Sequence, residues 1–242
     1  APVPEGAPTP PTEPDRGGPE RRRPGNEGSR RAPRGEDSPD GKLSIGLRDH
    51  NLILHERASG GDVVLTFDGS DVDAYEPRVF WSPDSKRLIA LRTRKGTEHR
   101  VSMIDSSPKD QIQPKVFSHD YLKPGDQIPV SRPHLFDVET RKEIPIEPEL
   151  APNPWSIGDY RWSPDSSRFT FLYNQRGHQV MRVIAVDATT GKASAIVDEQ
   201  PETFFCYSSK LFERRIDGSN ELIWMSERDG WNHLYLIDLN DG

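Results

Sequence analysis

The chain has 242 residues, of which 32% are hydrophobic, and a formal net charge of −7, so it is long enough for one large domain or two small ones. The acidic balance argues against nucleic acid as a partner, because nucleic-acid-binding domains present a basic surface. No apolar run reaches the roughly 20 residues of a membrane-spanning helix, and the sequence therefore predicts no membrane segment in this chain. The single cysteine, Cys206, excludes an internal disulfide framework and is expected to fill a core position.

The first part of the chain differs in composition from the rest. The first 40 residues contain ten of the 23 prolines, together with six glycines, seven arginines and eight carboxylates, and no aromatic residue. Such a segment buries too little apolar surface to offset the entropy of ordering it. We therefore predict a disordered tail over residues 1–41 and a folded region over residues 42–242.

From Lys42 onward, short apolar runs alternate with turn residues. The runs that read most clearly as strands are 51–54, 62–66, 87–91, 180–186 and 233–237. Between them lie Gly-, Asp-, Asn- and Pro-containing segments, whose backbone preferences suit tight turns. No helical periodicity longer than two turns occurs, so the sequence predicts an all-β protein.

One turn occurs twice together with its flanking residues. Residues 80–88, which contain Trp-Ser-Pro-Asp-Ser, correspond to residues 161–169 at an offset of 81 positions. The motif suits a hairpin: a strand ends on a buried tryptophan, Pro fixes φ, Asp and Ser cap the turn, and an apolar strand follows. Self-similarity of this kind is typical of repeat folds.

The offset itself has two interpretations. In the first, the 81 residues span two compact propeller blades, since they are close to twice the length of one. In the second, they span one blade that carries an insertion, and residues 116–137 would form that insertion as an extended hairpin arm. About 16 or 17 candidate strands, at four per blade, predict a partial β-propeller of about four antiparallel blades.

The most specific string of the sequence is Ser226-Glu-Arg-Asp-Gly-Trp-Asn-His-Leu-Tyr235. It resembles the N-terminal β-propeller of the dipeptidyl-peptidase IV family, within the prolyl oligopeptidase type of serine peptidases. Other matches occur in the same order along the chain as in the family; they are residues 48–52, 65–69 and 121–126 and the two Trp-Ser-Pro-Asp motifs. The Trp-Ser-Pro-Asp motif alone is less specific, since unrelated propellers of the TolB type also use it.

The resemblance implies a parent enzyme in which the propeller precedes an α/β-hydrolase domain that removes N-terminal dipeptides with Pro or Ala second. No G-x-S-x-G nucleophile elbow occurs in this chain. We therefore expect no catalytic residue here, no cofactor and no metal site, and peptide substrates that react through a hydrolase domain outside this chain. By resemblance, the parent protein would be periplasmic, secreted or membrane-associated.

In this family the propeller recognises the free amine of the substrate with a pair of glutamates. The matching interval here, residues 70–80, lacks an adjacent glutamate pair and offers Asp71, Asp73 and Glu76 instead. These acids are candidates for a displaced amine-binding site, with a solvated surface as the alternative. Arg228 and Asp229 are likewise either at an interface with the hydrolase domain or in a hairpin turn flanked by Trp224 and Trp231, which are then expected to pack across the strands.

Two functions follow from these features. The first is a substrate-gating propeller that belongs to a serine exopeptidase. The alternative is a non-enzymatic propeller that uses its blades to bind a protein or peptide.

Overall fold

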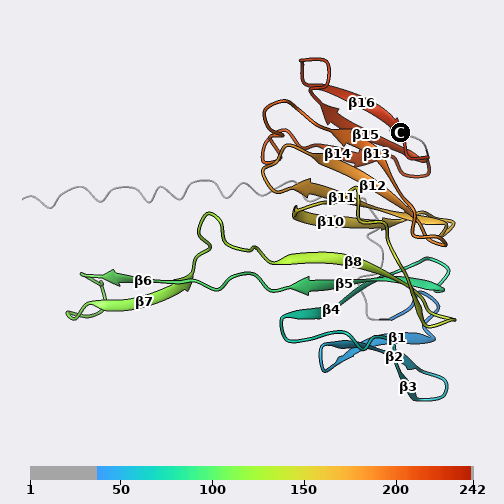
Figure 1. Ribbon diagram of the computed structural model, residues 1–242, viewed down its shortest axis with the longest axis horizontal. Helices are drawn as coiled ribbons and strands as arrows, with labels where there is room; N and C mark the ends of the chain where they lie inside the picture. Colours follow the sequence, from blue (N-terminus) through green and yellow to red (C-terminus); the bar gives the residue numbers. More distant parts are fainter. Residues whose placement is uncertain (1–36, 241–242) are drawn as a thin grey trace, which may run out of the picture. The chain divides into compact units, whose positions relative to one another are not determined.

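The computed structural model describes residues 37–240, which contain sixteen β-strands and no helix. Antiparallel pairing groups these strands into five sheets (Figure 1). Four sheets follow one another along the chain and are named blades 1 to 4; the fifth is a two-stranded hairpin. The predicted all-β partial propeller is thus confirmed. Most of the predicted tail, residues 1–36, lies outside the described residues.

Within each blade the order of the strands in the sheet follows their order in the chain. Blade 1 consists of β1 (Leu43–Arg48), β2 (Asn51–Glu56) and β3 (Gly61–Val64). Blade 2 consists of β4 (Asp73–Trp81), β5 (Arg87–Arg94), β8 (Val130–Asp137) and β9 (Lys142–Ile144). Blade 3 consists of β10 (Pro154–Trp162), β11 (Arg168–Gln175), β12 (Met181–Asp187) and β13 (Ala193–Glu199). Blade 4 consists of β14 (Glu213–Arg215), β15 (Glu221–Ser226) and β16 (His233–Asp238).

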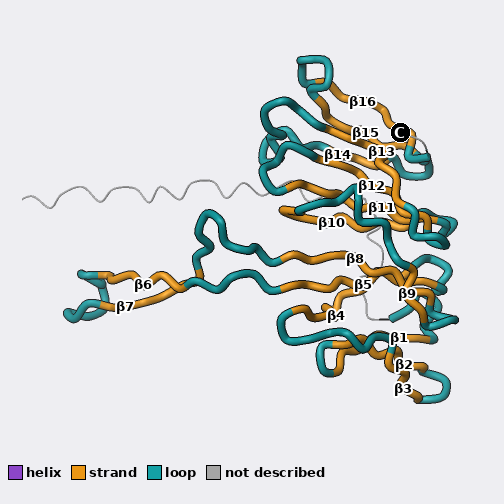
Figure 2. The backbone as a smooth tube through the Cα atoms, viewed as in Figure 1, coloured by secondary structure: helices purple, strands orange, loops and turns teal. Residues whose placement is uncertain are grey.

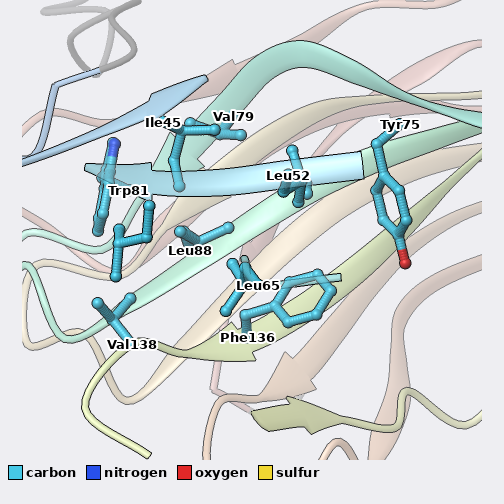
Figure 3. Close-up of a cluster of buried hydrophobic side chains, with 11 residues drawn as sticks. Ile45, Leu52, Leu65, Tyr75, Val79, Trp81, Leu88, Phe136 and Val138 are labelled. Atoms are coloured by element: carbon cyan, nitrogen blue, oxygen red, sulfur yellow. The ribbon is translucent and has the colours of Figure 1, made fainter. Parts of the chain in front are cut away.

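The middle strands bury side chains on both of their faces. In β5, Leu88 and Ala90 pack into a cluster with blade 1, whereas Ile89 and Leu91 pack into a cluster with blade 3. Figure 3 shows the first of these clusters, in which Leu88 lies among side chains from both blades. Because successive side chains of a strand point to opposite faces, a continuous apolar run joins one blade to both neighbours.

Strand β12 does the same between blades 2 and 4. Ile184 and Val186 join the cluster shared with blade 2, while Met181, Val183 and Ala185 join the cluster shared with blade 4. Burial of each large apolar side chain contributes about 1.5–3 kcal/mol. The clusters between blades therefore hold the fold together.

The turn after the first strand of a blade is held by one serine. In blade 2, Ser82 Oγ accepts the amide of Arg87 at 2.9 Å and donates to Asp84 Oδ1 at 2.6 Å. Ser163 makes the equivalent bonds in blade 3, to the amide of Arg168 and to Asp165. The Ser-Pro-Asp motif thus builds the hairpin that the sequence predicts. Trp81 is buried as expected, whereas the corresponding Trp162 is half-buried.

The same turn precedes β1, where the sequence analysis did not recognise it. Ser38 Oγ accepts the amide of Leu43 at 3.0 Å and donates to Asp40 at 2.7 Å. The hydroxyl of Ser38 is the main cause that lowers the pKa of Asp40 to about 2. The position of the tryptophan is taken by Asp37, which pairs with Ser44 as Trp81 pairs with Leu88.

The turns of neighbouring blades are bonded to each other. The amide of Asp40 donates to Ser85 Oγ, and the amide of Asp84 donates to Ser166 Oγ, both at 3.1 Å. Ser85 and Ser166 have positive φ values of 62° and 61°. These two hydrogen bonds join blade 1 to blade 2 and blade 2 to blade 3.

The offset of 81 residues corresponds to one blade with an insertion. Trp81 and Trp162 end the first strands of adjacent sheets, and the hairpin of β6 (Arg100–Asp105) and β7 (Lys115–Asp120) is inserted between β5 and β8. Figure 2 shows this hairpin set apart from the blades. At its base, His99 Nδ1 lies 2.7 Å from Asp126 Oδ2, and Arg176 of blade 3 donates to the Asp126 carbonyl at 2.9 Å.

Replacement of Ser82 by alanine should lower the free energy of unfolding by about 1–2 kcal/mol, because a buried turn then loses its central hydrogen bonds. Urea unfolding followed by circular dichroism measures this loss. The control is Ser102→Ala, which removes an exposed hydroxyl in β6. Equal unfolding midpoints for the two variants would contradict the role assigned to Ser82.

Candidate functional site

The three predicted site acids lie at the start of blade 2 but in different surroundings. Asp71 precedes β4 and is exposed, and its Oδ1 is 3.0 Å from Lys95 Nζ. The hydrogen bond from Lys95 and its positive charge lower the pKa of Asp71. The carboxylate of Asp71 is thus neutralised at the surface.

Asp73, the first residue of β4, is also paired with a cation. Its Oδ1 lies 3.3 Å from Arg92 Nε, and the same guanidinium binds Asp68 and lies over the ring of Tyr75 at 5.4 Å. Because Arg92 is mostly buried among these three groups, it is a structural partner for Asp73.

Glu76 is bound by neutral groups only. Its Oε1 accepts hydrogen bonds from the hydroxyls of Thr93 on β5 and Ser131 on β8, the latter at 3.2 Å. The side chain is half-buried, and no cation of residues 37–240 forms an ion pair with it. Of the three acids, Glu76 alone keeps a carboxylate charge that no paired cation offsets.

The position of Glu76 follows from an irregularity in β4. The pairing of β4 with β5 shifts register between Tyr75 and Val79, so Glu76, Pro77 and Arg78 form a bulge. Pro77 suits the bulge because it has no amide hydrogen for the ladder. Bulges redirect side chains and are frequent beside functional sites.

A buried tyrosine of blade 3 lies near this bulge. The ring of Tyr160 is 4.9 Å from that of Phe80, and its hydroxyl is buried with no hydrogen-bond partner among the described residues. Burial is the main cause that raises the pKa of Tyr160, and the negative charge of Glu76 adds to it. The negative charge of Glu76 on blade 2 therefore acts on Tyr160 of blade 3, across the boundary between these two blades.

Arg228 and Asp229 lie in the turn between β15 and β16, as the hairpin interpretation predicts. The carboxylate of Asp229 accepts the amide of Trp231 at 3.1 Å and binds His233 Nδ1 at 2.9 Å. The expectation that both flanking tryptophans pack across the strands was wrong for one of them. Trp224 is fully buried, whereas Trp231 is 74% exposed because it belongs to the turn itself.

Arg228 also connects blade 4 to blade 3. Its Nη2 donates to Glu199 Oε1 at 2.9 Å, and Trp224 Nε1 donates to the same oxygen at 3.1 Å. Arg228 further bonds Ser226 Oγ and lies over the ring of Tyr235 at 4.6 Å. The most specific string of the sequence thus has a structural function at a blade boundary.

Within residues 37–240, no histidine side chain is hydrogen-bonded to a serine. The histidine side chains that make hydrogen bonds do so with Asp, Glu or Asn; they are His55, His99, His134, His178 and His233. The described part of the chain also has no group of His, Cys, Asp or Glu placed to hold a metal ion. Over the same residues, no helix is long and apolar enough to cross a membrane.

Cys206 is only partly buried, in the loop before β14, so the expectation of a core position was wrong. Its Sγ lies 2.9 Å from Ser209 Oγ. The hydrogen bond with Ser209 is the main cause that lowers the pKa of the thiol.

Antiparallel sheets of three or four strands that follow one another and pack face to face define the chain as part of a β-propeller. The model of the family "Dipeptidyl peptidase IV (DPP IV) N-terminal region" matches residues 26–242. The chain belongs to this family.

Solved structures agree with this fold. A crystal structure of dipeptidyl peptidase 4 from Porphyromonas gingivalis is similar with a TM-score of 0.58 and 18% identity, over 83% of this chain and 30% of that one. A putative dipeptidyl aminopeptidase IV from Bacteroides ovatus is similar with a TM-score of 0.51 and 16% identity, over 83% of this chain and 34% of that one. The chain thus spans about a third of the length of these proteins.

Sequence reasoning missed one charged group of residues. Asp159 and Arg161 of β10 lie beside Glu213 and Arg215 of β14. No sequence signal marks this group, because the two pairs are more than 50 positions apart and share no motif.

Replacement of Arg228 by alanine should lower the free energy of unfolding by about 2 kcal/mol, because it leaves the buried carboxylate of Glu199 without its cation. Urea unfolding measures the effect. Arg214→Ala, which removes an exposed arginine of the same blade, should change the free energy by less than about 0.5 kcal/mol. A loss for Arg228→Ala no larger than that of the control would show that the contact contributes nothing.

Proposed function

We propose that this chain is the substrate-gating propeller portion of a dipeptidyl-peptidase IV-like serine exopeptidase. Membership of the family and the propeller fold support this proposal. The parent activity would be the release of N-terminal dipeptides with Pro or Ala second, carried out by a hydrolase domain outside these residues. The main support for a substrate-binding site is the carboxylate of Glu76, with which no cation of residues 37–240 forms an ion pair.

Glu76 would bind the free amine of a peptide substrate. A carboxylate and an ammonium group form short, charge-assisted hydrogen bonds that are about twice as strong as neutral ones. Thr93 and Ser131 would keep the carboxylate oriented while they leave its charge intact. Asp71 and Asp73 would contribute little to amine binding, because they already form ion pairs with Lys95 and Arg92, respectively.

The alternative function, a non-enzymatic protein-binding module, is favoured by one observation. The β6–β7 hairpin pairs with no blade and exposes apolar side chains, among them Ile104 and Val116 at 68% and 71%. Two-stranded hairpins are marginally stable alone, so a partner surface would stabilise this one. The two functions are compatible, because the hairpin and Glu76 are separate features.

Titration with a short peptide tests the role of Glu76. The peptide Ala-Pro-Ala should bind the chain weakly, with a Kd on the order of 1 mM, as followed by NMR shifts of blade 2 amides. Glu76→Gln and N-acetylation of the peptide should each weaken binding by about tenfold, because each removes one charge of the pair.

Asp71→Asn is the matched control and should leave the Kd unchanged. If Glu76→Gln binds the free-amine peptide as tightly as the unmodified chain does, Glu76 is not the amine anchor. The family membership would be unaffected by that result.

A further inference from the structure

A cavity of about 240 Å³ lies between blades 1 and 2. The three strands of blade 1 line it on one side, and two turns of blade 2, at residues 85–86 and 138–141, line it on the other. The amide of Val138 donates to the carbonyl of Lys86 at 2.9 Å, so the two turns are joined. The cavity lies beyond the end of β4, whereas Glu76 lies near the start of that strand.

The walls of the cavity are apolar. Leu54 and Val63 are cross-strand partners in β2 and β3, and Leu54 and Val138 belong to the cluster that blades 1 and 2 share. Figure 3 shows Val138 at one end of this cluster and Tyr75 at the other. An apolar side chain placed in the cavity would extend the cluster, and its removal from water would favour binding.

Charged side chains of both signs surround these walls. Glu56 is the last residue of β2, and Lys86, Glu139 and Arg141 come from the two turns of blade 2. All four are exposed. Within residues 37–240, Lys86, Glu139 and Arg141 form no ion pair, and the carboxylate of Glu56 is bonded to the neutral hydroxyl of Ser59 at 2.7 Å. Two carboxylates and two cations around one apolar cavity are thus available to a ligand that carries both charges.

Two further features of the blade 2 side support a ligand site. Ser85 is only 8% exposed, and its Oγ accepts the amide of Asp40 at 3.1 Å, which leaves the hydroxyl hydrogen for an acceptor in the cavity. Arg141 has a positive φ of 58°, which residues other than glycine adopt rarely and which is frequent at ligand-binding sites.

We propose that this cavity binds a free α-amino acid with an apolar side chain. The side chain would lie against the apolar walls, and the α-carboxylate would bind Lys86, Arg141 and the hydroxyl of Ser85. The α-ammonium group would bind Glu56 and Glu139 through charge-assisted hydrogen bonds. A ligand of this size suits the cavity, whose volume is below the roughly 300–1,000 Å³ of sites for drug-sized molecules. The proposal is independent of the peptide-binding function.

Titration of the full chain with L-leucine, followed by the NMR shifts of backbone amides, tests the proposal. The amides of Leu54, Val63 and Val138 should shift together, with a Kd on the order of 1 mM. Leucinamide lacks the carboxylate and N-acetyl-leucine lacks the ammonium group, so each should bind about tenfold more weakly. Equal affinities for the three compounds, or no saturable shift of these amides, would overturn the proposal.

Variants of the charged residues test which groups bind the ligand. Lys86→Gln and Glu56→Gln should each raise the Kd of leucine by about tenfold, because each removes one charge of the site. The matched control is Lys142→Gln, which removes an exposed cation of β9 that does not line the cavity and should leave the Kd unchanged. Equal Kd values for Lys86→Gln and Lys142→Gln would show that the cation at position 86 binds no carboxylate.

Urea unfolding gives a second readout, because a ligand that contacts both blades stabilises the folded chain. Leucine at ten times its Kd should lower the unfolding constant of the unmodified chain and of Lys142→Gln by about tenfold. At the same leucine concentration, the decrease for Lys86→Gln should be only about twofold. An unfolding constant of the unmodified chain that leucine does not change would contradict binding in this cavity.

Discussion

The middle strands must bury both of their faces, and the rest of the structure depends on this constraint. Strand β12 has a blade on each side, and its residues 183–186 alternate between the clusters shared with blades 2 and 4. A charge on such a strand needs a partner because burial of an unpaired charge is costly, and Arg182 of β12 has one in Asp198, at 2.8 Å. The carboxylate that we propose to bind the substrate amine, Glu76, lies elsewhere, in the bulge of the first strand β4.

Each boundary between blades combines apolar packing with polar contacts, and the polar contacts differ from one boundary to the next. Serine turns join blades 1, 2 and 3 through the amides of Asp40 and Asp84. At the boundary of blades 3 and 4, the ion pair of Glu199 and Arg228 supplies a polar link at 2.9 Å. This boundary therefore combines an ion pair with the apolar packing that all the boundaries share.

The features that could be predicted from the sequence are those that depend on neighbouring residues or on a periodic pattern. Apolar runs and turn residues predicted the strands, and the Ser-Pro-Asp turn was predicted because every residue in it has a backbone role. The offset of 81 had two interpretations because the inserted β6–β7 hairpin reads as two further strands. The turn at Ser38 was missed because Asp37 stands where the other copies have tryptophan. The choice of Glu76 over Asp71 and Asp73 could not be made, since it depends on cations supplied by β5 and the loop after it.

Amide hydrogen exchange of the unmodified chain, read by peptide mass spectrometry, shows whether a blade on each face holds β12 in place. We expect residues 181–187 to exchange among the slowest of the described strands and the β6–β7 hairpin to exchange fastest. Exchange of residues 181–187 as fast as that of residues 100–120 would contradict it.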